Sequence, residues 1–441
     1  MDHLKSNVFY RGKKGHLPLV DYAQSYWLVD SKGKKYLDAS GGPVVVNIGY
    51  GVEEVITAVT EQMTKCYYAH PTMFTNAPVE KLAQKLAEHS PKGINRFYFL
   101  TSGSEAIEAA IKMARQVHMA CGRPEKFRII SRWKSYHGLS LGALSVTGRT
   151  SFRKPYTPML LDVEHIAPPY CLRCFYGLTF PKCQLQCAKA LEETILNLGP
   201  ETVSAFLAET VSGATIAAVP PPPGYWPLIR SICDRYKVLL ILDEIMVGMG
   251  RTGRWFACEH YDVIPDIITL GKGLSGGSLP LSAVGIQGKH YDCLIEKGGF
   301  IHGGTFSHHP VTASAGLATV EVLEKNDLVN RAHQLGAVLG STLKRILDEN
   351  PFVAEVRGLG LLWGVEIVKD KKTLDPFPRK IKAADRIWEN LFQHGIILYK
   401  STGLAGRDGD ALVIAPPFVV NDEDLGLIAH SLEKAISEVL S

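Results

Sequence analysis

The chain has 441 residues, of which 46% are hydrophobic and 21% are charged, and its formal net charge is +4. This composition is typical of a globular protein with about two domains, and the lack of a dense run of Lys and Arg argues against nucleic acid as a partner. No apolar stretch reaches the roughly 18 residues that a membrane helix needs, and the first twenty residues lack the apolar core of a secretory signal. We therefore expect a cytoplasmic protein without a membrane contact.

The N-terminal part, residues 1–55, contains the stretch YWLVDSKGKKYLDAS, which predicts a β-hairpin. Residues 56–310 then alternate short apolar runs with helical patterns such as SEAIEAAIKMARQVHMA. Because the runs are apolar almost throughout, they predict strands of a parallel sheet buried on both faces, in an α/β fold. The predicted strands are 96–101, 127–131, 203–209, 238–244 and 266–272.

Residues 311–441 have a different pattern, in which long helical segments precede the strand-like stretches GLGLLWGVEIV and GIILYK. This order predicts a smaller α+β domain, and we expect the hairpin of residues 1–55 to pack on it. The chain would then consist of a large domain with a mostly parallel sheet, residues 56–310, and a small domain formed from its two ends.

Residues that follow the predicted strands are candidates for a site, since open α/β sheets bind ligands beyond the carboxyl ends of their strands. Gly103 and Ser104 open a helix whose first N–H groups can hold a phosphate, although Ser102 or Ser104 is equally typical of a plain helix cap. Tyr136 and His137 follow the second strand, where an aromatic side chain either covers a flat ligand ring or anchors a loop.

Two carboxylates and one lysine end the other strands. Glu209 and Asp243 each follow a fully apolar run, where burial is costly unless the charge is paired. Such acids are also ordinary loop anchors. Lys272 ends the last run between two glycines, which would leave room for a bulky adduct. A partly desolvated amine has a lowered pKa and can attack a carbonyl, whereas the alternative is a lysine whose charge reaches water.

Several motifs together resemble one enzyme family. The stretch GYWPLIRSICDRYKVLLILDEIMVGMGRTGRWFACEHYDVIPDIITLGKGLSGGSLPLSAV, with SGSEAIEAAIKMAR, YHG, HGGTFSHHP and APPFVV in the same order, resembles the class III aminotransferases. These are fold-type I enzymes that use pyridoxal 5′-phosphate (PLP), with a large domain around a mostly parallel sheet and a smaller domain. The resemblance covers nearly the whole chain.

The resemblance implies a role for each matching residue. Lys272 would form a Schiff base with the cofactor aldehyde and then carry the proton, while Asp243 would pair with the pyridine nitrogen. Thr305, in HGGTF, would reach the phosphate of the neighbouring subunit's cofactor, which implies a homodimer or a larger homo-oligomer. The remaining cofactor contacts would be Gly103 and Ser104 at the phosphate, Tyr136 and Ile245 on the two ring faces, and His137 and Glu209 close to the ring.

The implied reaction moves an amino group from an amine or ω-amino acid to a keto acid, through pyridoxamine phosphate. A PLP-dependent amino-acid racemase or epimerase is an alternative, because it removes the same proton and differs only in where the proton returns. A third alternative, from another class, is a zinc-stabilised binding protein without catalysis.

Two positions bear on the substrate. Met246 stands where the family often has glutamine. Arg407 lies in GRDGDALVIAPP, close to where many members that use keto acids carry a mobile arginine. Arg407 is either such a carboxylate clamp or a solvated loop arginine.

One cysteine cluster has no counterpart in the motifs above. Cys171, Cys174, Cys183 and Cys187 follow the spacing C-x2-C-x8-C-x3-C, which can close a structural zinc site. The alternatives are reduced thiols in a compact loop or oxidation-prone pairs. On every one of these interpretations the cluster is not catalytic, and we expect no metal at the active site.

Overall fold

A mixed sheet of seven strands forms the centre of the computed structural model, which describes residues 6–12 and 17–441. Its order is β4-β10-β9-β8-β7-β5-β6, and β10 is antiparallel to both neighbours while the other pairs are parallel. The expected α/β fold with a mostly parallel sheet is therefore confirmed. The strands are β4 (Ile94–Leu100), β5 (Arg128–Arg132), β6 (Glu164–Ile166), β7 (Val203–Glu209), β8 (Leu239–Asp243), β9 (Ile267–Leu270) and β10 (Ser282–Gln287).

Two of these strands were missed in the sequence. Strand β6 is only three residues long and lies at the edge of the sheet, so it leaves no apolar run to detect. Strand β10 carries Gly285 in its interior, and a glycine inside a strand weakens the strand pattern. A Cβ at Gly285 would lie 2.8 Å from side-chain carbons of Ile268 and Phe97, so the glycine allows close packing with both neighbouring strands.

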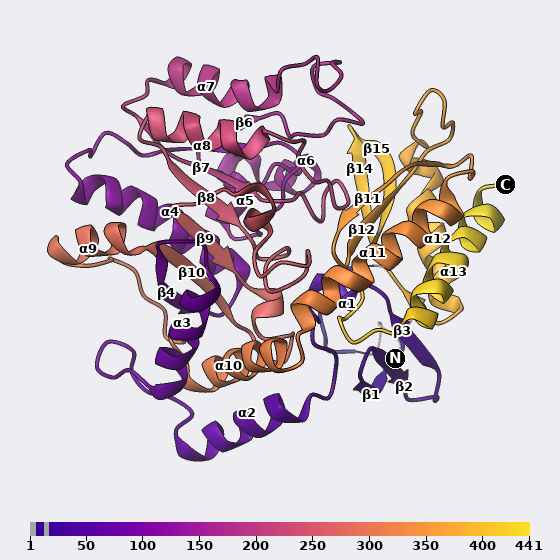
Figure 1. The fold of residues 1–441 in the computed structure, drawn as a ribbon, viewed down its shortest axis with the longest axis horizontal. Helices are drawn as coiled ribbons and strands as arrows, with labels where there is room; N and C mark the ends of the chain where they lie inside the picture. The colour runs from indigo at the N-terminus through magenta and orange to yellow at the C-terminus, as the bar shows by residue number, and fades with distance from the viewer. Residues whose placement is uncertain (1–5, 13–16) are drawn as a thin grey trace.

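Both faces of the sheet are buried at its centre, which explains why the central strands β7, β8 and β9 are almost entirely apolar. In β7, Phe206 and Ala208 belong to one core cluster, while Ala205 and Leu207 belong to the other. The second cluster includes helix α4 (Gly103–Ala120), and the first includes α7 (Gln186–Leu198) and α8 (Tyr225–Arg235). Figure 1 shows this sheet on one side of the molecule and a second, C-terminal sheet on the other.

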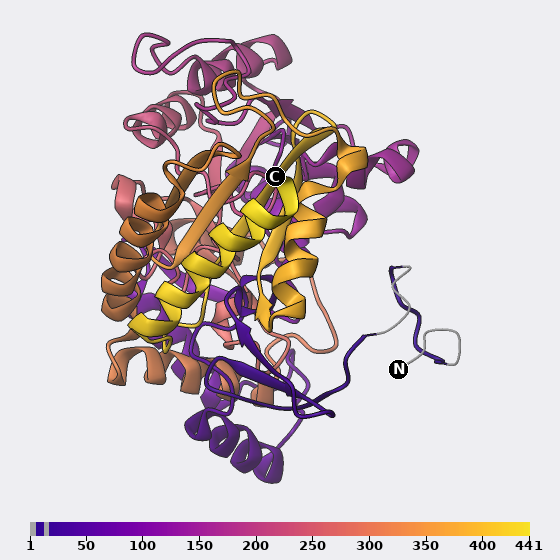
Figure 2. The same ribbon diagram turned by 90° about the vertical axis from the view of Figure 1, so that its right-hand side faces the viewer.

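The smaller α+β part combines both ends of the chain. The hairpin of β2 (Trp27–Asp30) and β3 (Lys35–Asp38) forms as expected, and β3 pairs in parallel with β13 (Ile396–Ile397). The second sheet has the order β11-β12-β15-β14, and helix α13 crosses the front of this part in Figure 2. Its further elements are α11 (Leu328–Leu347), β11 (Val353–Leu359), β12 (Leu362–Ile367), α12 (Ala383–Gln393), β14 (Tyr399–Ala405), β15 (Asp408–Ile414) and α13 (Asp422–Leu440).

The boundary between the large and the small part is less distinct in the structure than in the sequence pattern. Helix α10 (Pro310–Lys325) follows the large sheet in sequence, yet it packs against α2 (Glu53–Lys65) and α3 (Ala77–His89). The domain boundaries near residues 55 and 310 stay a prediction. The remaining elements are β1 (Val20–Gln24), α1 (Gly41–Val44), α5 (Leu141–Val146), α6 (Thr150–Arg153) and α9 (Gly288–Glu296).

Within the described ranges, every helix is too short or too polar to cross a membrane. The expectation that the first twenty residues carry no secretory signal falls partly on residues 1–5 and 13–16, which lie outside the described residues.

Candidate active site

A cavity of about 190 Å³ opens at the carboxyl ends of the parallel strands. It brings together residues that follow five different strands, which is where ligands bind in open α/β sheets. Its lining residues are Ser102, Gly103, Ser104, Tyr136, His137, Gly138, Glu209, Val211, Ala214, Asp243, Ile245, Met246, Val247 and Lys272.

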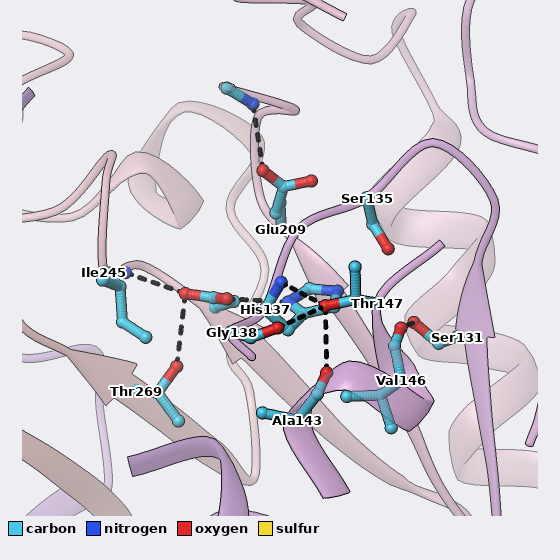
Figure 3. Close-up of polar contacts among 12 residues, drawn as sticks. Ser131, Ser135, His137, Gly138, Ala143, Val146, Thr147, Glu209, Ile245 and Thr269 are labelled. Carbon is cyan, nitrogen blue, oxygen red and sulfur yellow. Dashed lines mark hydrogen bonds and ion pairs between the residues drawn. The ribbon is translucent and has the colours of Figure 1, made fainter. Parts of the chain in front are cut away.

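Asp243 is the most firmly held side chain of the cavity. The ring of His137 donates from Nδ1 to Asp243 Oδ2 over 2.7 Å, and both side chains are at most 5% exposed. The other carboxylate oxygen accepts from the backbone N–H of Ile245 at 3.0 Å and from the hydroxyl of Thr269 at 3.4 Å (Figure 3). These contacts fix the carboxylate at the floor of the cavity and satisfy the pairing that a buried charge requires.

His137 is itself fixed from the opposite side. Its backbone N–H donates to Thr147 Oγ1 at 2.9 Å, and that hydroxyl donates in turn to the carbonyls of Ala143 and Gly138, as Figure 3 shows. The ring nitrogen Nε2 is buried and has no hydrogen-bond partner within the described chain. His137 therefore orients Asp243. From the sequence, His137 was expected as an aromatic side chain over a ligand ring or as a loop anchor, and this contact was not anticipated.

Glu209 is a second buried carboxylate of the cavity. One of its oxygens accepts from the backbone N–H of Gly213 at 3.1 Å, while Oε2 has no partner among the described residues. Burial raises the pKa of Glu209, and the nearby charge of Asp243 raises it further. The free oxygen makes Glu209 available to a ligand.

Lys272 shares the cavity with these two carboxylates. Burial lowers the pKa of its amine to about 8, although the charges of Asp243 and Glu209 act in the opposite direction. An amine with this pKa is partly neutral near physiological pH, and the neutral form is the nucleophile and the base. The half-buried Lys272 thus stands at the end of β9 with a lowered pKa, and its role as the reactive amine stays a prediction.

The turn that carries Lys272 is strained and closely packed. The residue has φ +45°, a left-handed conformation that costs free energy in a residue other than glycine. A Cβ at Gly271 would lie 3.3 Å from Ile245, and one at Gly273 would lie 2.9 Å from the amide nitrogen of Asn47. The flanking glycines therefore allow these two neighbours to approach, and the expectation that they leave room for an adduct stays a prediction.

Asn47, from the N-terminal part, supports the same turn. Its buried side-chain amide donates to the carbonyls of Met249 and Gly273, and both hydrogen bonds are 3.1 Å long. Asn47 and Thr269 were missed in the sequence. Thr269 had a visible signal, because it is the hydroxyl-bearing residue in the apolar run IITL before Lys272. Asn47 had none, since it is distant in sequence from both segments that it joins.

The start of α4 forms another wall of the cavity. Ser102 is the N-cap, and it forms a capping box with Glu105. Of the two serines that the sequence offers as a helix cap, Ser102 is therefore the one that caps α4. Gly103 and Ser104 then present the first N–H groups of the helix, which have no partner inside a helix and favour an anion. Gly138 is required here, because its φ is +133° and a Cβ would lie 2.3 Å from Ser104 Oγ.

Three further side chains bound the space. Tyr136 packs edge-on against Phe152, with 6.0 Å between the ring centroids. Ile245 lies close to Gly103, where a Cβ would meet its Cδ1 at 3.2 Å. Met246 approaches Gly213, and a Cβ there would lie 2.1 Å from the sulfur, so a thioether occupies the position that the family often gives to glutamine.

The structure does not bring the other two predicted residues into the cavity of this chain. Thr305 is exposed in the segment between α9 and α10, and Arg407 is exposed in the turn between β14 and β15. Neither of them lines the cavity. Of the two alternatives for Arg407, a mobile carboxylate clamp or a solvated loop arginine, its exposed position fits the second.

The four clustered cysteines line a separate cavity of only about 20 Å³, in the loop before α7. Among residues 6–12 and 17–441, no group of three or more His, Cys, Asp or Glu side chains is arranged to hold a metal ion. Cys171, Cys174, Cys183 and Cys187 are free thiols. This arrangement fits the alternative of reduced thiols in a compact loop.

Comparisons with known proteins agree with this site. The model of the family Aminotransferase class-III matches residues 9–436. The chain is 37% identical over 424 residues to the aminotransferase YodT of Bacillus subtilis, covering 96% of this chain and 95% of the relative. It is 33% identical over 432 residues to a putrescine–pyruvate aminotransferase of Pseudomonas aeruginosa, covering 96% and 92%.

Solved structures give the same result. An (S)-enantioselective ω-transaminase from Thermomicrobium roseum matches with a TM-score of 0.90 at 36% identity, covering 97% of this chain and 94% of that one. The racemase alternative is therefore not favoured, and neither is a binding protein without catalysis. This chain belongs to the class III aminotransferases and is a PLP-dependent transaminase.

Proposed function

We propose that the enzyme moves an amino group from an amine or ω-amino acid to a keto acid in the 190 Å³ cavity, with Lys272 as the catalytic amine. The observation that carries this proposal is that Lys272 and Asp243 line the same cavity, where the amine has a lowered pKa and the buried carboxylate is held by three hydrogen bonds. The donor class is supported by two similar proteins, a putrescine–pyruvate aminotransferase and an ω-transaminase.

The residues of the cavity fit PLP. Two buried polar atoms, His137 Nε2 and Glu209 Oε2, have no partner in the described part of the chain. The start of α4 offers Gly103 and Ser104 to a phosphate. Asp243 is a fixed carboxylate for the ring nitrogen, Tyr136 and Ile245 are apolar surfaces for the ring, and Lys272 is the amine for the aldehyde.

When bound, PLP withdraws electrons from the substrate carbon that bears the amino group. With PLP bound, the fixed carboxylate of Asp243 would stabilise a proton on the ring nitrogen, and the hydrogen bond from His137 holds that carboxylate in place. Lys272, in its neutral form, would take the proton from the substrate carbon and return it to the cofactor carbon that carried the aldehyde. Because its pKa is lowered to about 8, a larger fraction of this amine is neutral near pH 7 than of an ordinary lysine.

We also propose that the active enzyme is a homodimer. Met73 and Phe74 are exposed large apolar side chains, and both line a groove of about 1000 Å³; such exposed apolar side chains in a groove are typical of interaction surfaces. Ile301 and Phe306 are 81% and 57% exposed, and they flank Thr305. A second copy covering this face would bury them and bring Thr305 to the partner's cavity, in agreement with the family resemblance.

The half-reaction tests the function. The enzyme with bound PLP, given an unbranched amine and no keto acid, should release about one equivalent of carbonyl product per site, and adding pyruvate should restore the absorbance of the starting cofactor form. Lys272→Ala should release none, whereas Lys434→Ala, a change of an exposed lysine on α13, should behave like the wild type. Product release by Lys272→Ala at the wild-type rate would disprove the role of Lys272.

The lowered pKa of Lys272 gives a pH dependence with a definite sign. Because the pKa is lowered to about 8, the neutral fraction should rise from about one tenth at pH 7 to about nine tenths at pH 9. Acetylation of the cofactor-free protein, followed by peptide mass spectrometry, should show this rise at Lys272. A rate that increases only as the pH passes about 10, the range of ordinary lysines, would contradict the lowered pKa.

The dimer is tested by mass in solution. Light scattering should give twice the chain mass of 48.4 kDa. Phe306→Asp places a charge in the apolar face and should shift the protein toward monomer with loss of bound PLP, while Leu427→Asp, at an exposed position of α13, should not. A wild-type monomer that retains PLP and activity would exclude a shared site.

A further inference from the structure

Arg149 lies beside the substrate cavity and its surroundings do not neutralise it. The residue precedes α6, and its guanidinium stacks on the ring of Phe152, 4.5 Å from the ring centroid. The same Phe152 packs edge-on against Tyr136, which lines the cavity. Arg149 is thus connected to a residue of the cavity wall through a single aromatic side chain.

The hydrogen bonds of Arg149 are weak and incomplete. Nη2 donates to the carbonyl and the hydroxyl of Thr402, at 3.4 and 3.3 Å, which is longer than typical N–H···O distances. Nε is buried without a partner, and none of the described Asp and Glu residues forms an ion pair with Arg149. Arg149 as a whole is half-buried, and a guanidinium with a buried N–H that lacks a partner is costly, so its retention points to an anion from outside the chain.

Electrostatic interactions place this charge on a defined side of the cavity. Burial is the main cause that lowers the pKa of Arg149, while Tyr399 and Tyr136 raise it. Tyr399 also interacts with Glu209, whose free oxygen faces no protein partner in the described chain. Arg149 therefore belongs to the side formed by Tyr136, Tyr399 and Glu209.

The start of α4 is a separate part of the wall. Its Gly103 and Ser104 line the cavity and are the residues available to the cofactor phosphate, whereas Arg149 contacts Phe152, which packs on Tyr136. The phosphate thus has its own candidate residues, which leaves Arg149 for an anionic group of the substrate.

We propose that Arg149 binds the carboxylate of the amino-group donor, so that the preferred donors are ω-amino acids rather than simple amines; this inference rests on the proposed transamination. The planar guanidinium offers paired N–H donors that match a carboxylate. Its stacking on Phe152 holds the plane in place. Arg407, the candidate from the sequence, lies on the same β14–β15 hairpin as Thr402 but is exposed to water.

A matched series of donors tests this role. Unbranched ω-amino acids of three to six carbons are compared with the amines in which a methyl group replaces the carboxylate, for example 5-aminopentanoate with pentylamine. For the best acid of the series, Arg149→Gln should raise KM about 10- to 100-fold, the loss expected for charge-assisted hydrogen bonds. Arg149→Lys should recover part of this loss, and kcat/KM for the amine should stay within about twofold, which also shows that the variant is folded.

Arg407→Gln is the matched control, because it removes the same charge as Arg149→Gln. It should leave KM and kcat/KM unchanged for both the acids and the amines. Equal effects of Arg149→Gln on acids and amines would overturn the assignment, as would a selective loss of the acids in Arg407→Gln alone. A wild type that prefers the amines throughout the series would overturn it too.

A binding measurement separates this inference from the proposed function. Titration calorimetry of the PLP-bound protein with pentanoate and hexanoate, which carry no amino group and do not react, should show at least tenfold weaker binding of the tighter acid in Arg149→Gln. If no amine reacts with the wild type, the proposed function fails while this titration still tests Arg149. If the wild type and Arg149→Gln bind both acids equally, the assignment of Arg149 is wrong even when transamination is demonstrated.

Discussion

The site depends on one buried carboxylate, that of Asp243. A charge at the end of an apolar strand is stable only when its neighbours satisfy it, and here His137, the Ile245 backbone and Thr269 do so from three elements. The same carboxylate acts on the amine of Lys272 across the cavity, where burial has the larger effect and lowers the pKa. Strands β8 and β9 pair in register, so the fold itself fixes the spacing between the two groups.

Much of the fold was predictable because its cause is local. Strands β7, β8 and β9 are buried on both faces, and this burial produces the continuous apolar runs that identify them. The residues after those strands, from Gly103 to Lys272, converge because parallel strands end at one edge of the sheet. Strands without this signature, such as the short edge strand β6, were not predictable in the same way.

The rest of the site depends on contacts between distant segments. Asn47 supports the Lys272 turn from more than 200 positions away, and nothing in its local sequence indicates this. The close approach at Gly273 was unpredictable for the same reason, since a Cβ there would lie 2.9 Å from the amide nitrogen of Asn47. Arg149 carried no motif, and only the structure shows that its side chain is stacked, half-buried and without a carboxylate. Spacing alone likewise suggested zinc at four cysteines that the described structure does not arrange as ligands.

The central assignment is that Lys272 is the amine that binds PLP, and its most direct test is chemical. Borohydride reduction of the PLP-bound protein makes the bond between cofactor and lysine permanent, and peptide mass spectrometry then identifies the modified residue. We expect the added mass on the peptide that contains Lys272, at close to one per chain. Stoichiometric modification of another lysine, with Lys272 unmodified, would contradict the assignment and the chemistry derived from it.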